Sequence, residues 1–349
     1  MARHRWDPIA RAVSVVHPSR VGSLITPAGQ PPLTLTPARA RGGQWDRTSA
    51  GLYVPAGTDR VLAQQRIVEA AARLPPYAAV TGWAACLLLG AAWLDGLGRD
   101  GSTRLPVRVA VGPRGGVRRD KAMTVSFERL PEWEVWRRYG VRVTRPERAV
   151  FDEMRQHGCR EALVVLESAL AGRLTSLERL RAYCATRRSA RRFDVVAQAL
   201  TRARGGVRSP LEVRVRTVAE EDAGYARLEV NRVVLSADGR RIGEVDLLDP
   251  ESGTVIEVDG ADHRDVDQQS WDITKEEALR QVGLEVARVT GRQARDEVAL
   301  AARLGAVRAR SRFIEPGLRS WQLAPHDVDN EVWLSEREQE AMWHESFGD

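Results

Sequence analysis

Two alternating runs of residues that flank a short turn constrain this chain more than any other stretch. The segment IGEVDLLDPESGTVIEVDGADH, residues 242–263, contains the turn-forming cluster 250–253 between two strand-like runs. If the hairpin closes symmetrically on this four-residue loop, residue 249 faces 254, 248 faces 255, 246 faces 257 and 244 faces 259. Because side chains alternate between the faces of a strand, one face then carries four carboxylates, those of Glu244, Asp246, Glu257 and Asp259.

These four carboxylates need compensation. Like charges on directly opposite residues, whose Cβ atoms lie roughly 4.5–5.5 Å apart, destabilise an antiparallel pair. A divalent cation is the simplest remedy, because Mg²⁺ typically binds one or two carboxylates together with waters and phosphate oxygens. The alternative is a solvated hairpin with an acidic outer face, since a one-residue slip in register reverses every side chain. The hairpin therefore predicts either a metal site or an acidic surface.

The residues around this hairpin predict a mixed α/β domain over 206–315. Ser209, Pro210 and Glu212 have the N-cap, first-turn proline and capping-box pattern of a helix start. That structural role explains Glu212 by itself. An Asp-Gly turn at 238–239 predicts another strand pair ahead of the first hairpin. With the helical and strand patterns that follow, the expected order is helix, three strands, helix, strand, helix.

The N-terminal part of the chain predicts two further regions. Residues 1–60 are rich in proline and glycine, so we expect part of them to be poorly ordered, with a short hairpin at 44–57. Residues 61–205 predict a basic α+β region. Its most apolar run, 78–94, is too short to span a bilayer and is predicted to be a buried helix.

Charge is distributed unevenly along the chain, whose formal net charge is +6. Residues 1–205 carry 34 basic against 17 acidic side chains, residues 206–315 carry 17 against 22, and residues 316–349 carry 2 against 8. A basic half ahead of a carboxylate-bearing domain is typical of a protein that binds phosphates with one part and acts with another. The alternative is compositional bias, because 51 of the 53 basic residues are arginine. The acidic tail is predicted to contact a basic partner or the chain's own basic half, or to be a loosely ordered segment.

Two groups of arginines are candidates for contact with DNA. One group precedes the C-terminal domain, and the other lies in the Gly/Arg-rich loop 112–121. Contacts with the phosphate backbone would give salt-sensitive affinity without sequence choice. A solvated helix face and an exposed loop are the alternatives. The candidates are Arg187, Arg188, Arg191, Arg192, Arg118 and Arg119.

Cysteine usage and the N-terminus indicate the compartment. Cys86, Cys159 and Cys184 are far apart and lack the paired spacing of a disulfide framework or a zinc site. The first residues contain no apolar core of the length found in signal peptides. We therefore expect a cytoplasmic protein with no membrane partner.

The ordered motifs of residues 207–312 resemble the uncharacterised endonuclease-fold domains related to very short patch repair endonucleases, within the PD-(D/E)XK nuclease superfamily. The matching features are SPLE at a helix start, VD on the second strand, IEVDG..H on the third, and WD with EALRQVGLEVARVT after it. Upstream, VTGWAACLLLG, VRVTRPERAVFDEM and EALVVLESALAGRLTSLERL resemble actinobacterial proteins with an AbiEi-like antitoxin region, and GLYVP resembles the end of the wing in their small winged-helix unit. The resemblance covers roughly residues 44–312. It implies a restriction-endonuclease-like domain preceded by a basic α+β region with a winged-helix remnant.

The resemblance implies roles for the residues at matching positions. Asp246 and Glu257 would be the carboxylates that bind Mg²⁺ or Mn²⁺, and Glu212 would be the acidic residue contributed by the first helix. Asp259 and His263 match the continuation of the third-strand motif. In such nucleases the metal generates a water nucleophile. His263 would orient that water or protonate the leaving oxygen.

One departure from the superfamily pattern concerns the lysine expected two residues after the acidic residue, because that place is taken by Asp259. Lys275, on the following helix, is the only lysine of the domain. It is either a migrated catalytic lysine or a partner of nearby acidic residues. The predicted function is a Mg²⁺-dependent DNA endonuclease. The alternative is a non-enzymatic DNA-binding regulator of the AbiEi antitoxin kind with a degenerate nuclease domain.

Overall fold

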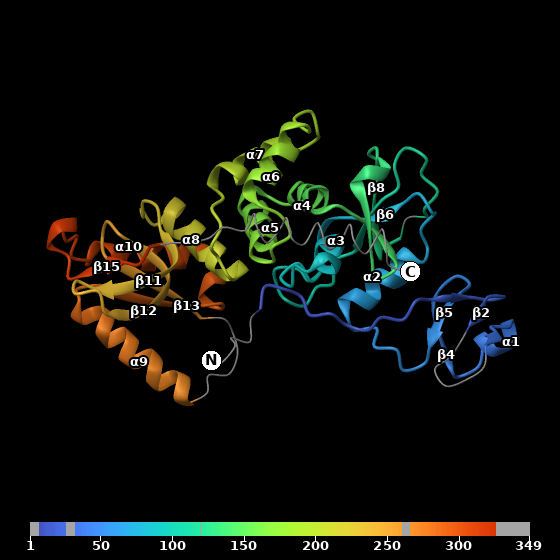
Figure 1. The fold of residues 1–349 in the computed structure, drawn as a ribbon, viewed down its shortest axis with the longest axis horizontal. Coiled ribbons are helices and arrows are strands. Elements are labelled where there is room, and N and C mark those ends of the chain that lie inside the picture. Colours follow the sequence, from blue (N-terminus) through green and yellow to red (C-terminus); the bar gives the residue numbers. More distant parts are fainter. Residues whose placement is uncertain (1–6, 26–31, 119, 260–265, 326–349) are drawn as a thin grey trace. The chain divides into compact units, whose positions relative to one another are not determined.

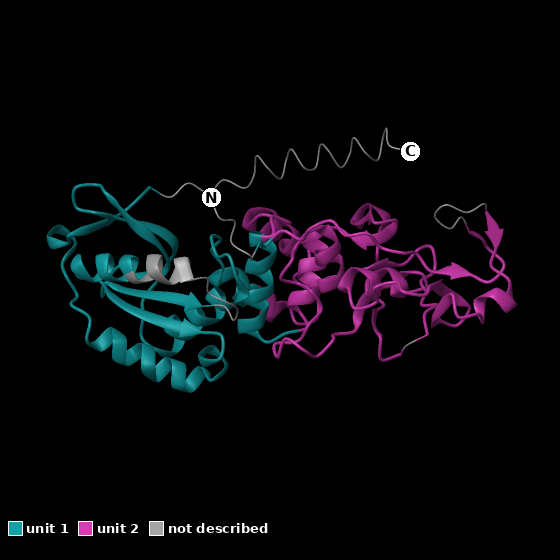
Figure 2. Cartoon of the chain, turned by 90° about the horizontal axis from the view of Figure 1, so that it is seen from below, with its two compact units in different colours: residues 1–8, 157–171, 197–349 teal, residues 9–156, 172–196 magenta. Residues whose placement is uncertain are grey.

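The computed structural model describes residues 7–25, 32–118, 120–259 and 266–325, the last range with side chains from residue 274 onwards (Figure 1). The chain forms two compact units, each built from separate stretches of sequence (Figure 2). The fold is mixed α/β, as predicted, with ten α-helices and four sheets in these residues. Unit 1 comprises residues 1–8, 157–171 and 197–349, and unit 2 comprises residues 9–156 and 172–196.

Unit 1 is built around a five-stranded sheet of order β14-β13-β12-β11-β15. β13 and β14 are parallel, and the other neighbours are antiparallel. The predicted order of helix, three strands, helix, strand, helix is confirmed. The elements are α5 (Cys159–Ala171), α8 (Pro210–Asp222), β11 (Glu229–Ser236), β12 (Arg241–Asp249), β13 (Thr254–Asp259), α9 (Val266–Gln281), β14 (Glu285–Thr290), α10 (Glu297–Ala309) and β15 (Trp321–Leu323).

The strand β15 lies beyond the predicted domain boundary at residue 315. It pairs antiparallel with β11, inside the segment predicted as an acidic tail. This pairing covers an edge whose backbone groups would otherwise be exposed. Residues 326–349 of the predicted tail lie outside the described residues.

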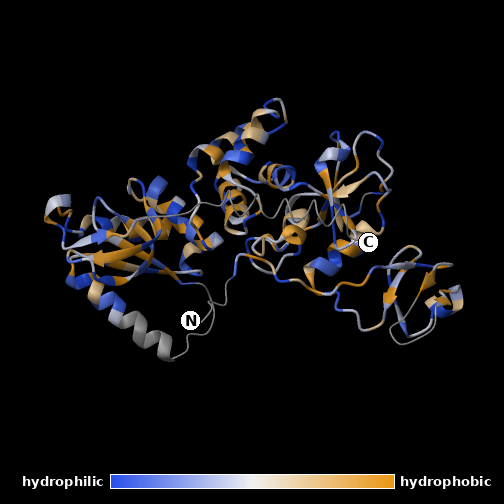
Figure 3. Ribbon diagram, viewed as in Figure 1, coloured by the Kyte–Doolittle hydropathy of each residue, from blue (hydrophilic) through white to orange (hydrophobic). Residues whose placement is uncertain are grey.

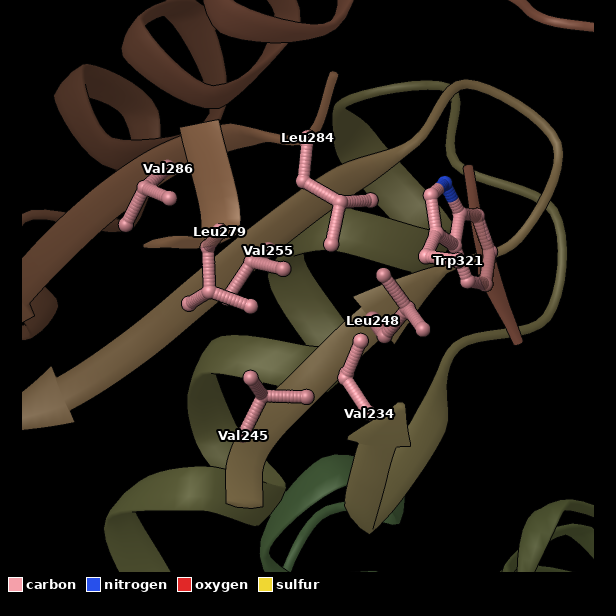
Figure 4. Packing of buried hydrophobic residues seen from close by; sticks show 8 residues of the cluster. All are labelled: Val234, Val245, Leu248, Val255, Leu279, Leu284, Val286 and Trp321. Carbon is pink, nitrogen blue, oxygen red and sulfur yellow. The ribbon is translucent and has the colours of Figure 1, made fainter. Parts of the chain in front are cut away.

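The core of unit 1 consists of aliphatic side chains from the sheet and from α9, closed at one edge by Trp321, which is 6% exposed. Figure 3 shows that hydrophobic residues are concentrated in the strands of this sheet. Their burial supplies the main favourable free energy of folding. The cluster in Figure 4 contains Val234, Val245, Leu248, Val255, Leu279, Leu284, Val286 and Trp321.

The helix α5 belongs to unit 1, although the prediction placed it in the basic region 61–205. Its partner is α8, the first helix of the predicted domain. Arg216 Nη2 of α8 lies 2.7 Å from Glu167 Oε1 of α5, and both side chains are fully buried. A charge in the interior must be paired, so this ion pair attaches α5 to the C-terminal domain.

Unit 2 contains a second five-stranded sheet, of order β8-β7-β6-β10-β9. The helix α3 (Gly82–Leu89) is buried along its whole length, which confirms the predicted buried helix. None of the described helices is long and apolar enough to cross a membrane. The other elements are α2 (Ala63–Ala71), β6 (Ala79–Val80), β7 (Val107–Ala110), β8 (Met123–Ser126), β9 (Val135–Arg138), β10 (Val141–Thr144), α4 (Pro146–Met154) and α6 (Leu177–Ala185), while α7 (Phe193–Arg202) has residues in both units.

The described part of residues 1–60 forms small β-structures with one short helix. The predicted hairpin at 44–57 is confirmed as an antiparallel pair. Within the described residues up to 60, the α-helical structure is limited to the four residues of α1. The elements are β1 (Ser19–Arg20), β2 (Leu24–Ile25), β3 (Leu33–Thr34), α1 (Pro37–Ala40), β4 (Trp45–Ser49) and β5 (Leu52–Pro55).

Candidate functional site

The hairpin β12–β13 has the predicted register only next to its turn. The ladder pairs are Asp249 with Thr254, Leu248 with Val255, and Leu247 with Ile256. The predicted pairs 246/257 and 244/259 do not form. β13 lies between β12 and β14: it pairs in parallel with β14 from Thr254 to Asp259, and it separates from β12 beyond Ile256.

Asp246 lies where the two strands separate. Its Oδ2 accepts a hydrogen bond from the backbone N–H of Val258 at 2.7 Å, so the side chain takes the place of a backbone ladder partner. Burial raises the pKa of Asp246, while the Val258 N–H and the charge of Lys275 act in the opposite direction. The carboxylate is thus fixed in orientation at a poorly solvated position.

Glu257 is the second carboxylate at this point. Lys275 Nζ of α9 lies 2.7 Å from Glu257 Oε1, and the two side chains are 17% and 15% exposed. Burial and then the charge of Asp246 raise the pKa of Glu257 to about 7, although Lys275 opposes the rise. The charge of Asp246 therefore acts on Glu257, although the predicted cross-strand pair of these two residues does not form.

Glu212 fulfils its predicted capping role and also lies beside the site. Ser209 Oγ accepts a hydrogen bond from the Glu212 N–H at 3.2 Å and donates one to Glu212 Oε1 at 2.8 Å. The Arg208 N–H donates to Oε2 at 3.0 Å. Burial raises the pKa of Glu212, and the charge of Asp246 adds to the rise. Glu212 therefore stabilises the start of α8 and also lies near enough to Asp246 for their charges to interact.

Asn231 was missed by sequence reasoning, although it connects Glu212 to the strand that faces Asp246. The register of β11 with β12 places it opposite Asp246, between the pairs Val230–Leu247 and Arg232–Val245. Its φ is 48°, a left-handed conformation that asparagine adopts more readily than most residues. Its Nδ2 donates to Glu212 Oε2 at 2.8 Å and to the Gly206 carbonyl at 2.7 Å. Strained backbone of this kind clusters at functional sites.

We expect Asn231→Gly to lower the free energy of unfolding by about 1.5 kcal/mol, because it removes the amide donor to a carboxylate. Asn231→Ala should lose roughly 1 kcal/mol more, because alanine is disfavoured at positive φ. Urea denaturation of the two variants beside wild type measures both effects. An Asn231→Ala variant as stable as Asn231→Gly would contradict the strain at this position.

Lys275 reaches Glu257 across a glycine. A Cβ added to Gly243 of β12 would lie 3.1 Å from Lys275 Cγ and 3.3 Å from Cδ. The aliphatic stem of the lysine therefore occupies the space that a side chain at position 243 would need. Lys275 is thus the partner of an acidic residue, as one of the two interpretations from the sequence had it, but this acid belongs to β13 and not to the helix of the lysine.

The remaining predicted site residues are distributed differently. Asp259 lines a small pocket together with Glu257, Lys275 and Arg288. Glu244 instead forms an ion pair with Arg208, so the predicted face of four uncompensated carboxylates does not exist. His263 lies outside the described residues.

The donor set of the site is small. In the described part of the chain, no group of three or more His, Cys, Asp or Glu side chains is arranged to hold a metal ion. The pair Asp246 and Glu257 fits Mg²⁺ or Mn²⁺ only if waters and phosphate oxygens complete the coordination, which is the usual arrangement for Mg²⁺.

The predicted DNA-binding arginines of unit 2 differ in their surroundings. Arg187 forms an ion pair with the buried Glu134, and its guanidinium lies 5.2 Å from the centre of the Tyr183 ring. That contact gives Arg187 a structural role. Three others in the same stretch and one in the loop 112–121 are exposed, namely Arg188, Arg191, Arg192 and Arg118, while Arg119 lies outside the described residues.

Comparisons of the chain with models of protein families, with curated proteins and with solved structures found no match. The resemblance to endonuclease-fold and antitoxin proteins therefore stays a prediction from motifs. Evidence on function comes from the geometry around Asp246, Glu257 and Lys275.

Proposed function

We propose that this chain is a metal-dependent nuclease that hydrolyses phosphodiester bonds in DNA, with its centre at Asp246, Glu257 and Lys275. The observation that carries this proposal is the convergence of two poorly solvated carboxylates and one lysine where β12 and β13 separate. Burial raises the pKa of both carboxylates, and the charge of Asp246 adds to the rise at Glu257; perturbed carboxylates of this kind are typical of functional sites.

The chemistry of the donor set supports Mg²⁺ or Mn²⁺ as the cofactor. Asp246 and Glu257 would hold the ion, since a divalent charge would offset the repulsion between them. When bound, such an ion lowers the pKa of a coordinated water and stabilises the charge that develops on the phosphate. The Val258 N–H fixes the orientation of the Asp246 carboxylate. Asp246 Oδ2 accepts this backbone hydrogen bond, so Oδ1 would be the oxygen that coordinates the metal ion.

Lys275 supplies the positive charge that the superfamily pattern expects two residues after the acidic residue. Its ammonium is a compact group with three donors, and it can contact a carboxylate and a phosphate oxygen together. The chain contains 51 arginines and only 2 lysines, and one of these lysines lies against Glu257. Asp259 and Arg288 at the same pocket would set the charge that approaching DNA meets.

The test of the proposal is the nicking of supercoiled plasmid DNA by the purified full chain with Mg²⁺ or Mn²⁺, with EDTA as the control. Calorimetric titration with Mn²⁺ in the absence of DNA measures the metal site independently. We expect metal-dependent nicking and one Mn²⁺ site. Absence of nicking with both ions, together with absence of Mn²⁺ binding, would overturn the proposal.

Lys275→Met is expected to slow nicking about tenfold or more, because a hydrogen bond from a charged donor contributes about 1.5–3 kcal/mol. Mn²⁺ affinity should stay the same or increase, because the variant removes a cation that competes for Glu257. Gly243→Ala should change the nicking rate in the same direction by displacing the lysine stem, and Gly317→Ala, where a Cβ meets nothing within 4 Å, is its control. Unchanged nicking by Lys275→Met would remove the lysine from the mechanism.

A second candidate function is favoured by one observation. Lys275 already neutralises Glu257 within the chain, so the site is electrostatically tolerable without a metal. This supports a non-enzymatic DNA-binding regulator of the AbiEi antitoxin kind that keeps the nuclease-like domain as a scaffold. Salt-sensitive DNA binding by wild type without Mn²⁺ binding, and unchanged in Asp246→Asn, would favour this function.

A further inference from the structure

The strand β9 (Val135–Arg138) forms one edge of the unit 2 sheet. Its sheet neighbour is β10, and the order β8-β7-β6-β10-β9 leaves its outer edge without a strand in the described part of the unit. A short 3₁₀ turn, Glu132–Glu134, leads into it. An edge strand presents an extended row of side chains and backbone groups to a partner.

Three aromatic residues lie in or next to this strand: Trp133 in the 3₁₀ turn, Trp136 in β9 and Tyr139 directly after it. The indole of Trp133 is 67% exposed, an unusual exposure for so large an apolar side chain. Trp136 and Tyr139 are half-buried, and each is covered by a guanidinium. Arg145 lies 5.0 Å from the centre of the Trp136 ring, and Arg138 lies 5.2 Å from that of Tyr139.

The positive charge of this surface is not neutralised by its own acidic residues. Arg137, Arg138 and Arg145 are exposed, and no carboxylate of the described residues lies within ion-pair distance of them. Glu132 pairs with Arg142, and this contact is the main reason why the pKa of Glu132 is lowered. The charge of Arg137 lowers the pKa of Glu132 further, by a smaller amount. Glu134 is buried against Arg148 and Arg187.

This arrangement contrasts with the rest of the chain, where many arginines have carboxylate partners. Arg60, Arg73 and Arg108 of unit 2 all form ion pairs. Arginines without a carboxylate partner beside an exposed indole are a feature that internal packing does not explain. A polyanion with flat apolar groups matches both parts of the surface, because phosphates suit the arginines and bases suit the indole.

We propose that the β9 edge of the unit 2 sheet, with Trp133, Arg137, Arg138 and Arg145, binds single-stranded nucleic acid along its length. Arg137 and Arg138 are adjacent in β9 and point to opposite faces, so only a ligand bound along the edge contacts both. A base stacks on the exposed Trp133, and the phosphates on either side contact the arginines. A single strand is favoured over a duplex because its base faces are free to stack. The inference rests on the proposed function only in that the partner is nucleic acid, since the surface belongs to unit 2 and the carboxylates belong to unit 1.

The test is fluorescence anisotropy with a labelled oligo-dT strand and with a duplex of equal length, both in EDTA so that no cleavage occurs. Trp133→Ala should weaken oligo-dT binding about tenfold and duplex binding less, because stacking is lost. Arg137→Gln with Arg138→Gln should reduce the slope of log affinity against log salt by about 1.4, two contacts at about 0.7 each. The matched control is Arg240→Gln with Arg241→Gln, an exposed arginine pair of unit 1.

Each outcome decides between defined alternatives. Equal oligo-dT affinity for wild type and Trp133→Ala overturns the proposal, and so does a duplex preference that is independent of Trp133. If the control variant with Arg240→Gln and Arg241→Gln loses oligo-dT affinity to the same extent, binding depends on overall charge and not on this surface, which also overturns the proposal. A wild type that binds oligo-dT through Trp133 but neither nicks DNA nor binds Mn²⁺ supports this inference and overturns the nuclease. Nicking with no contribution from Trp133 does the reverse.

Discussion

Asp246→Asn and Glu257→Gln are each expected to slow DNA nicking by about 100-fold or more. Each change removes one of the two carboxylates proposed to hold the metal, and the interactions of a bound metal contribute several kcal/mol to transition-state stabilisation. A tenfold loss of rate corresponds to about 1.36 kcal/mol, so a loss of this size gives at least two orders of magnitude. The amides keep the size of the carboxylates, and the side-chain oxygen of the Asp246→Asn variant can still accept the Val258 N–H.

Initial nicking rates over a range of Mn²⁺ concentrations, with enzyme in excess over plasmid, measure this loss. Glu244→Gln is the matched control, because Glu244 lies two residues before Asp246 on the same strand but pairs with Arg208. It should nick at nearly the wild-type rate. Equal rates for Glu244→Gln, Asp246→Asn and Glu257→Gln would show that the carboxylate pair has no special role.

The β12–β13 hairpin shows which strand pairs could be predicted from the sequence and which could not. Its turn residues and the alternation next to them predict the pairs 249/254 and 248/255, and both form, because a four-residue turn fixes the register of its nearest neighbours. Further from the turn, β13 loses β12 as a partner and keeps only β14, which comes from beyond α9 and pairs with β13 along its whole length. Alternation along one strand does not encode which distant strand will pair with it.

The same reason explains what sequence reasoning missed at the site. Asn231 and Gly243 act through contacts with Glu212 and Lys275, which lie elsewhere in the chain. Neither residue has a spacing that marks it. A signal was present at Asn231, because asparagine is depleted in strands and tolerates positive φ. β15 is also too short, at three residues, for periodicity to reveal it.

Arginine clusters predicted from the sequence could not be separated into exposed and paired side chains. Arg187 and Arg188 are adjacent, yet Arg187 contacts a buried carboxylate and Arg188 is exposed. The difference arises from Glu134, more than fifty residues earlier in the chain. The aromatic residues around β9 were likewise not recognised, because the exposure of Trp133 depends on the edge position of the strand that follows its 3₁₀ turn.

Arg148→Met is expected to lower the free energy of unfolding of unit 2 by about 3–5 kcal/mol. Arg148 is 1% exposed on α4, and its Nη1 lies 2.9 Å from Glu134 Oε2 while its Nε lies 2.8 Å from Asp152 Oδ2. Both carboxylates are buried as well. Removal of the guanidinium leaves them with less compensation at a place where water cannot replace it.

Urea denaturation followed by circular dichroism measures this loss, and two further variants define its cause. Arg145→Met changes an exposed arginine at the start of the same helix and removes only its contact with the Trp136 ring, so its free energy of unfolding should stay within about 1 kcal/mol of wild type. Arg148→Lys keeps the charge, but a single ammonium cannot reproduce the two directed contacts of the guanidinium, so its loss should be intermediate. A loss below about 1 kcal/mol in Arg148→Met would contradict the central role of this residue. A loss in Arg148→Lys equal to that in Arg148→Met would show that geometry matters here and that net charge does not.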